Sequence, residues 1–275
     1  MRRTRDSAMA VGERIHNRKL AKRLLERGDR LRERGKLAAA ESFYRQSLEL
    51  RKSVPSPEHA EVAQCMNSLA NLLQERGRYA EAEPLYRESL RLRKKTLGPE
   101  HRDVASSLSN LANLLQSTGR SREAESLYLQ SLRLRKKAYG PGHQNVAMCM
   151  SNLAILMGAT GRHEKAESLL RKALQLLGQS VGPTHELTAY TKANLADFLL
   201  LNQRPAEALA FAKEAREDLR AILPSGHRYN KWARSVLKRA KEQNDNYHPT
   251  SGPGGRAPPT VNRRFRRNKP ARWPW

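Results

Sequence analysis

The chain has 275 residues, of which 38% are hydrophobic, 29% are charged and only 5% are aromatic. The small aromatic fraction argues against a large β-sheet core and favours helices packed through Leu and Ala. With 52 Lys and Arg against 27 Asp and Glu, the formal net charge of +25 predicts attraction to a polyanion, whether nucleic acid, an anionic membrane or an acidic protein.

Features of membrane and secreted proteins are missing from the sequence. No run reaches the roughly 20 apolar residues that span a bilayer, and no apolar segment follows the charged N-terminus to indicate a secretory signal. The two cysteines, Cys65 and Cys149, are too few for a disulfide framework. We therefore expect no membrane span and a cytoplasmic location, with the nucleus as the alternative.

Residues 1–19 are rich in Arg and Lys and are predicted to form a basic N-terminal segment. Beyond them, the sequence repeats every 42 residues: Leu-Ala-Asn-Leu-Leu occupies 69–73 and 111–115, and related sequences follow at 153–156 and 195–199. A shared period of this length is typical of tandem helical repeats. Three further residue types keep the period, at Gly35, Gly77, Gly119 and Gly161, at Ala40, Ala82, Ala124, Ala166 and Ala208, and at His59, His101, His143, His185 and His227.

Each repeat is predicted to contain two helices. In the second repeat, apolar residues at helical spacing predict a first helix over 62–74, which Gly77 ends, and a second helix over 79–96. Small residues such as Ala70 and Ala82 would let the two helices approach closely. We therefore predict an all-α fold with repeats at 20–59, 60–101, 102–143, 144–185 and 186–227, a capping helix at 228–243 and a disordered basic tail at 244–275.

The second repeat also resembles a known family. Ala-Glu-Pro-Leu-Tyr at 82–86, Leu-Arg-Lys-Lys at 92–95 and Gly-Pro-Glu-His at 98–101 resemble the tetratricopeptide repeat (TPR), in its kinesin-light-chain form of 42 residues. The resemblance covers about residues 20–227 and implies an α-α superhelix, or solenoid, of about five helix pairs. The fold hosts many partners. Because no heptad segment is long enough to pair with a motor heavy chain, a motor-cargo function is not implied.

The resemblance implies that the first helix of each repeat lines a concave groove, and carboxamides recur on that helix. They lie three or four residues apart, so within a repeat they share a face, and their donors and acceptors suit an extended peptide backbone. The alternative is that they are solvated or bond between neighbouring helices. The predicted peptide-binding residues are Asn67, Asn71, Gln74, Asn110, Asn113, Gln116, Asn152 and Asn194.

Basic residues also gather at the ends of the second helices and in the tail. Helix ends such as Arg93-Lys94-Lys95 are predicted to be a solvated face that matches the helix dipole. The main functional prediction is a non-enzymatic protein–protein interaction scaffold that holds a partner polypeptide in the groove. The alternative is a nucleic-acid- or ribosome-associated adaptor that uses the basic N-terminus and tail. Its predicted polyanion contacts in the tail are Arg263, Arg264, Arg266, Arg267, Lys269 and Arg272.

No metal, cofactor or catalytic site is predicted. Equivalent histidines of stacked repeats would lie on the order of 10 Å apart, whereas zinc ligands lie about 2 Å from the metal, so these histidines are interpreted as turn residues. The two cysteines occupy equivalent places in distant repeats and are expected to be small core residues. No phosphate-binding loop, Gly-x-Ser-x-Gly or His-Glu-x-x-His motif occurs.

Overall fold

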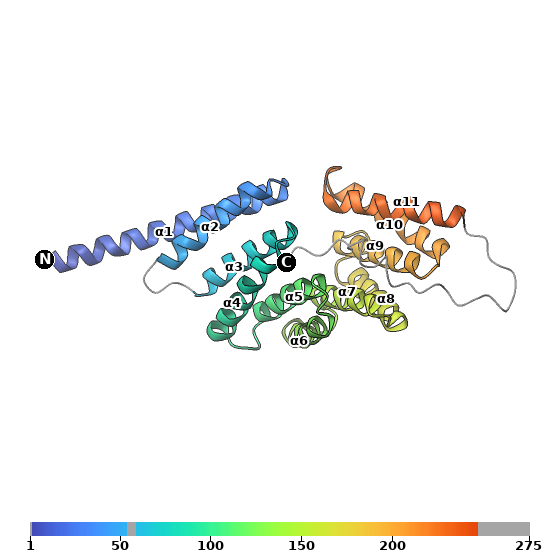
Figure 1. The fold of residues 1–275 in the computed structure, drawn as a ribbon, viewed down its shortest axis with the longest axis horizontal. Helices are drawn as coiled ribbons and strands as arrows, with labels where there is room; N and C mark the ends of the chain where they lie inside the picture. Colours follow the sequence, from blue (N-terminus) through green and yellow to red (C-terminus); the bar gives the residue numbers. More distant parts are fainter. Residues whose placement is uncertain (1, 54–58, 247–275) are drawn as a thin grey trace. The chain divides into compact units, whose positions relative to one another are not determined.

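The computed structural model describes residues 2–53 and 59–246, and these ranges are built from helices without a β-strand (Figure 1). The predicted all-α fold class is confirmed. None of the helices in these ranges combines the length and apolar character that crossing a bilayer requires. The helices are α1 (Arg2–Glu33), α2 (Leu37–Ser53), α3 (His59–Glu75), α4 (Tyr79–Leu97), α5 (Arg102–Ser117), α6 (Ser121–Tyr139), α7 (Gln144–Ala159), α8 (His163–Ser180), α9 (Glu186–Leu201), α10 (Pro205–Ile222) and α11 (Arg228–Asp245).

Contacts divide the chain into two units, of which the first ends at Leu134 and the second begins at Arg135, within α6. In the first unit, α1 packs against α2, α2 against α3, α3 against α4, and α4 against α5. In the second unit, α7 packs against α8, α8 against α9, and α9 and α10 both pack against α11. Successive helices therefore form packed pairs, α1–α2 through α9–α10, as the predicted solenoid class requires.

The two helices of a pair cross at small residues that are completely buried. Ala82 and Ala124 have no exposed surface. At the same crossing, a serine of the second helix donates a hydrogen bond to an alanine carbonyl of the first helix. In the fourth and fifth pairs, the serine is replaced by the fully buried Ala173 and Ala215. The serine bonds join Ser47 to Ala21, Ser89 to Ala63 and Ser131 to Ala105, each at 2.7 Å.

The turn between the two helices of a pair uses a left-handed backbone conformation. The predicted helix stops Gly77, Gly119 and Gly161 have φ values of 77°, 84° and 84°. In the fifth pair, Gln203 adopts a φ of 58° at the same position. Glycine takes this conformation without steric cost, whereas a residue with a Cβ atom is strained there. The fifth pair therefore keeps the turn in spite of its side chain.

Four of the periodic histidines cap the N-termini of the helices that follow them, α5, α7, α9 and α11. Nδ1 of His101 accepts a hydrogen bond from the backbone N–H of Asp103 at 3.1 Å, and His227 accepts one from Tyr229 at 3.3 Å. This role satisfies an N–H group that would otherwise have no partner at the helix start. The interpretation of these histidines as turn residues is confirmed and becomes more specific. The same cap occurs at His143 and His185.

At the N-terminal end of the array, the first helix is longer than the helices of the middle. The predicted basic segment 1–19 and the start of the first repeat lie on one continuous helix, α1. At the other end, α11 occupies the place of the predicted capping helix and packs against α9 and α10. The predicted tail boundary falls within α11, and residues 247–275 lie outside the described residues. The proposed subdivision into repeats remains a prediction.

Ion pairs link the second helices of neighbouring pairs. An arginine at the start of one second helix bonds a glutamate of the preceding second helix, 37 residues earlier. The same arginine bonds a glutamate three residues later, as Arg120 does with Glu123 at 2.7 Å. Apart from the buried Glu41, these groups are at least partly exposed, so each ion pair contributes modestly to stability, but their repetition favours one register of adjacent pairs. The links are Arg78–Glu41 (2.8 Å), Arg120–Glu83 (2.7 Å) and Arg204–Glu167 (2.6 Å).

We predict that Gln203→Gly stabilises the second unit by about 1 kcal/mol, because it removes the strain of a left-handed residue with a Cβ atom. Gly161→Gln is the reverse change in the fourth pair, where a Cβ atom would meet nothing within 4 Å. It should destabilise by a similar amount through the backbone alone. Urea denaturation measures both free energies of unfolding, and changes of the same sign would contradict this account of the turn.

We also predict that acidification weakens the start of α11. Burial lowers the pKa of His227, and the nearby Arg228 acts in the same direction while Glu186 opposes it. Because the neutral ring is the form that caps the helix, stability is fully present above the unfolded pKa of about 6.5 and is lost as pH falls through the lower folded value.

The loss should be about 1 kcal/mol and should appear as faster hydrogen exchange in α11 at pH 5.5 than at pH 7.5, after correction for intrinsic rates. His227→Asn is the control, since asparagine caps a helix without titrating. An identical pH dependence in this variant and the unmodified chain would rule out His227 as the titrating group.

Candidate peptide-binding face

A tyrosine of the second helix fixes the predicted amides of the first helix in the α3–α4 pair. The Tyr86 hydroxyl lies 2.6 Å from Oδ1 of Asn71 and 2.9 Å from Oε1 of Gln74. A phenol has one proton, so the Tyr86 hydroxyl donates a hydrogen bond to only one of the two amides. The other amide turns its N–H group toward the phenol oxygen, which accepts that bond. Burial raises the pKa of Tyr86, so the hydroxyl keeps its proton and this bond.

The same arrangement recurs in the neighbouring pairs of the first unit. The Tyr128 hydroxyl donates to Oδ1 of Asn113 and lies 3.2 Å from Oε1 of Gln116. In the first pair, the Tyr44 hydroxyl donates to Oδ1 of Asp29 at 2.6 Å. A carboxylate and a carboxamide both serve here, because what the phenol needs is an acceptor oxygen.

A second set of amides bonds between neighbouring first helices. Nδ2 of Asn110 on α5 donates to Oδ1 of Asn67 on α3 at 3.1 Å. Asn110 is only 2% exposed, so this bond satisfies a carboxamide that the packing has removed from water. Asn67 and Asn110 therefore bond between neighbouring helices, which was the alternative to a role in a peptide-binding groove.

In the second unit, the equivalent position lacks this bond. By the repeat, Ser151 and Asn194 correspond to Asn67 and Asn110. They are 0% and 3% exposed, and within the described part of the chain no hydrogen-bond partner reaches Oγ of Ser151 or either polar atom of Asn194. Buried polar groups without partners are rare, so this pair has unused capacity to bond.

The predicted amides are less exposed than the sequence pattern suggested. Asn110, Asn113, Asn152 and Asn194 are buried, because each first helix is covered by its own second helix and by its neighbours. The other four are half-buried. These are Asn67, Asn71, Gln74 and Gln116.

A charged pair replaces the tyrosine bond in the fifth pair. Asp197 occupies the position of Asn113, and Ala212 occupies that of Tyr128. Arg239 of α11 lies 2.7 Å from Oδ1 of Asp197. Burial raises the pKa of Asp197, and the guanidinium of Arg239 opposes that shift. The terminal helix α11 therefore supplies the partner that a tyrosine supplies elsewhere.

Sequence reasoning missed the tyrosine bonds, although the repeats contain a signal for them. Tyr86 and Tyr128 accompany Asn71 and Asn113, whereas the fourth repeat has Leu and Ile at the two corresponding positions. The polar residue and its tyrosine thus occur together and are replaced together. Such joint variation among repeats of one chain indicates a contact.

The prediction of a solvated basic face at the ends of the second helices is right for some residues and wrong for others. Lys94 and Lys95 are exposed. Arg93 is buried, and its Nη1 donates to the Asp103 carbonyl at 3.0 Å and to Oγ of Ser107 at 2.9 Å. These bonds join the end of α4 to the start of α5. The equivalent Arg51 and Arg135 are also buried, each at 6% exposure.

The remaining predicted sites give no second centre. Cys65 and Cys149 are free and buried, as expected of core residues, and burial raises the pKa of the Cys65 thiol. Among the described residues, no group of three or more His, Cys, Asp or Glu could hold a metal ion. The predicted polyanion contacts of the tail lie outside the described residues. They are Arg263, Arg264, Arg266, Arg267, Lys269 and Arg272.

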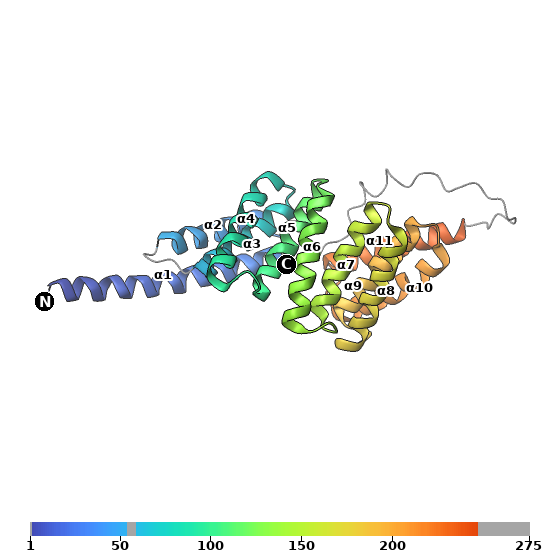
Figure 2. The ribbon, with the colours of Figure 1, turned by 90° about the horizontal axis from the view of Figure 1, so that it is seen from below.

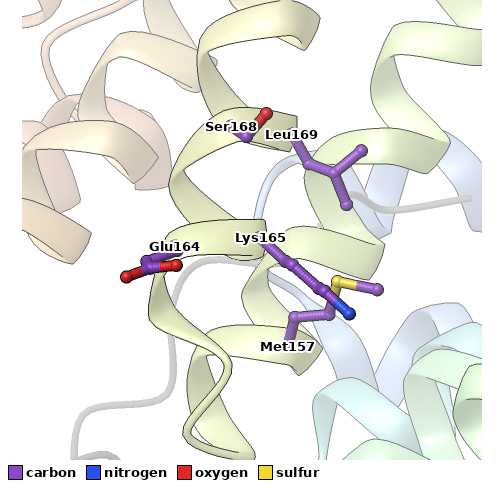
Figure 3. A pocket seen from close by; sticks show the side chains of 5 residues that line it. All are labelled: Met157, Glu164, Lys165, Ser168 and Leu169. Atoms are coloured by element: carbon purple, nitrogen blue, oxygen red, sulfur yellow. The ribbon is translucent and has the colours of Figure 1, made fainter.

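An open pocket lies on α7 and α8 of the second unit (Figure 3). It is lined by Met157, Glu164, Lys165, Ser168 and Leu169. Its polar groups are exposed side chains of one helix face. None of the predicted amides lines it, so it is separate from the candidate peptide-binding face.

Comparisons with known proteins extend over most of the chain. The family model described as tetratricopeptide repeat matches residues 20–95, 66–137, 103–179 and 159–221. The crystal structure of BtubC (BKLC) from P. vanneervenii is 20% identical, with a TM-score of 0.57 over 92% of this chain and 96% of that chain. No curated protein matches in a sequence search.

Two further structures come from a Podosopora anserina protein described as a kinesin light chain with nearly identical TPR-like repeats. Both are 22% identical to this chain. One has a TM-score of 0.60 over 74% of this chain and 96% of its own length, and the other has 0.59 over 76% and 99%. At identities of this size, the likeness concerns the fold.

We predict that Tyr128→Phe lowers the free energy of unfolding by about 0.5–1.5 kcal/mol, because it leaves the buried Asn113 without its hydroxyl donor. A double-mutant cycle with Asn113→Ala, followed by urea denaturation, should give a favourable coupling energy of about 1 kcal/mol. Strict additivity of the two changes would show that the bond contributes nothing.

Proposed function

Because the chain belongs to the tetratricopeptide repeat family, we propose that it is a protein–protein interaction scaffold that binds an extended segment of a partner polypeptide along its first helices. Proteins of this family are typically non-enzymatic scaffolds. The candidate face consists of the amide-bearing side of α3 and α5 in the first unit, and the corresponding side of α7 and α9 in the second unit.

The observation that carries this proposal is the fixed orientation of half-buried amides. Oδ1 of Asn71 accepts a hydrogen bond from the Tyr86 hydroxyl. The same carboxamide has two N–H donors in addition to that oxygen. Asn71 and Gln74 are half-buried, so a ligand can reach them. An amide already held in one rotamer loses little conformational entropy on binding. A peptide backbone, which needs one donor or acceptor at each residue, is the complementary ligand.

The test uses Asn71→Asp combined with Asn113→Asp. Each aspartate keeps the acceptor oxygen for the tyrosine, as Asp29 does for Tyr44 in the first pair, but it removes the N–H donors. A partner is first captured by the unmodified chain and identified by crosslinking, and its affinity is then measured by calorimetry at high salt, where charge effects are screened. We expect the affinity of the folded double variant to fall about tenfold, since each lost hydrogen bond is worth about 0.5–1.5 kcal/mol.

A matched control adds the same charge on the second helices. Gln46→Glu combined with Gln130→Glu alters two exposed positions whose equivalent in the second repeat is already glutamate, Glu88. This control should leave affinity unchanged. If both double variants bind the captured partner as well as the unmodified chain does, the first helices are not its binding surface.

A further inference from the structure

The helix α1 is much longer than its pair requires. It has 32 residues, whereas its partner α2 and the next first helix α3 have 17 each. Figures 1 and 2 both show α1 extending well past α2. Among the described residues, no second helix lies beside the N-terminal half of α1.

Exposed cations follow one side of this helix. Arg18, Lys19, Lys22 and Arg23 are all exposed. Arg18 and Lys22 are four residues apart, as are Lys19 and Arg23, so they form two adjacent rows on the helix surface. Like charges at this spacing destabilise a helix. A bound polyanion would remove that repulsion.

Arginines at the turns of the first unit form ion pairs. Arg78 is paired with Glu41, and Arg120 with Glu83. By contrast, Lys19, Lys22 and Arg23 form no ion pair within the described ranges 2–53 and 59–246. Arginines at the turns between paired helices are thus neutralised by glutamates, whereas Lys19, Lys22 and Arg23 of α1 are not.

The geometry of this charge favours a duplex over other polyanions. Residues four apart on a helix are about 6 Å apart along its axis, so the cations form a line that needs a continuous line of negative charge. Duplex DNA presents one phosphate for about every 1.7 Å of axis, and its major groove, about 12 Å wide, admits a helix. Arginine also bonds phosphate oxygens in a bidentate manner.

Single-stranded nucleic acid fits less well. Binding of single strands relies on aromatic side chains on which bases stack. In the described part of the chain, the exposed large hydrophobic side chains are all aliphatic: Ile15, Leu20, Leu129 and Ile222. Two of them lie on α1, and neither offers a stacking surface.

We propose that the exposed cationic side of α1 binds the phosphate backbone of a double-stranded nucleic acid. The contact is independent of base sequence, since the cations reach phosphates and the proposal includes no base-reading group. It is also independent of the peptide-binding face, which lies on the amide-bearing side of the first helices. The chain would thereby join a nucleic-acid duplex to a protein partner.

The test measures binding of the full chain to short mixed-sequence DNA and RNA duplexes by fluorescence anisotropy over a series of salt concentrations. The variant combines Arg18→Gln, Lys19→Gln, Lys22→Gln and Arg23→Gln. We expect affinity at low salt to fall at least tenfold, and the slope of log K against log salt for the DNA duplex to become shallower by about 3.6 if these four contacts are lost.

Two control variants separate α1 from charge elsewhere in the chain. One replaces four exposed cations of the second unit, so that it loses the same charge as the α1 variant. It should bind within about twofold of the unmodified chain, because these cations touch no phosphate in the proposed contact. The other replaces the tail cations and should keep the steep salt dependence that α1 provides. The substitutions are Arg220→Gln, Lys231→Gln, Arg234→Gln and Lys241→Gln, and, in the tail, Arg263→Gln, Arg264→Gln, Arg266→Gln, Arg267→Gln, Lys269→Gln and Arg272→Gln.

Hydrogen exchange shows which residues the duplex covers, and a general loss of charge would not produce protection at one place in the chain. Duplex binding should slow exchange in residues 12–23 of the unmodified chain. If the fourfold variant loses helicity by circular dichroism, Lys19→Glu with Arg23→Glu replaces it, with the same expected loss of binding. Equal weakening by the α1 and second-unit variants would overturn the proposal. So would loss of duplex binding in the tail variant alone, or displacement of the duplex by polyglutamate at equal charge concentration, which would indicate an acidic protein as the partner.

Discussion

The close crossing of the two helices in each pair is the constraint on which the other features depend. Small residues make it possible: Ala82 and Ser89 have no exposed surface, and at Gly28 an added Cβ atom would lie only 2.6 Å from the Tyr44 ring. A larger side chain at these points would push the helices apart. Because a hydrogen bond tolerates only a few tenths of an ångström, such a shift would also break the bonds that cross the pair.

Those bonds decide which polar residues the core can hold. In the first unit, Tyr86 and Tyr128 bond amides of the neighbouring helix, and a serine bonds a carbonyl at the crossing. Burying a polar group is costly unless it is paired, so a residue and its partner must change together. The replacement of a tyrosine bond by the Asp197–Arg239 ion pair shows how the last pair meets the same requirement through the terminal helix.

The basic side chains fall into two groups, those that bond to neighbouring helices and those that stay exposed. Arginines at the turns and at the ends of the second helices are paired with glutamates or with backbone oxygens of the next helix, and so connect successive pairs. Their net energetic contribution is modest where solvent reaches them, but they use up acidic residues. Cations such as Lys19, Lys22, Arg23, Lys94 and Lys95 remain exposed.

The sequence by itself determined the helix pairs, their turns and the fold class, because each depends on local periodicity and on residues such as Gly77 and His101 that act within one turn of chain. It also located the amide-bearing helix side. Only the tertiary structure decided that Asn110 is buried and bonded to Asn67, that Arg93 is buried against α5, and that Asn194 finds no hydrogen-bond partner among the described residues. Those outcomes depend on groups up to 43 residues away, whose distance is set by how one pair packs on the next, and a periodic pattern contains no measure of that distance.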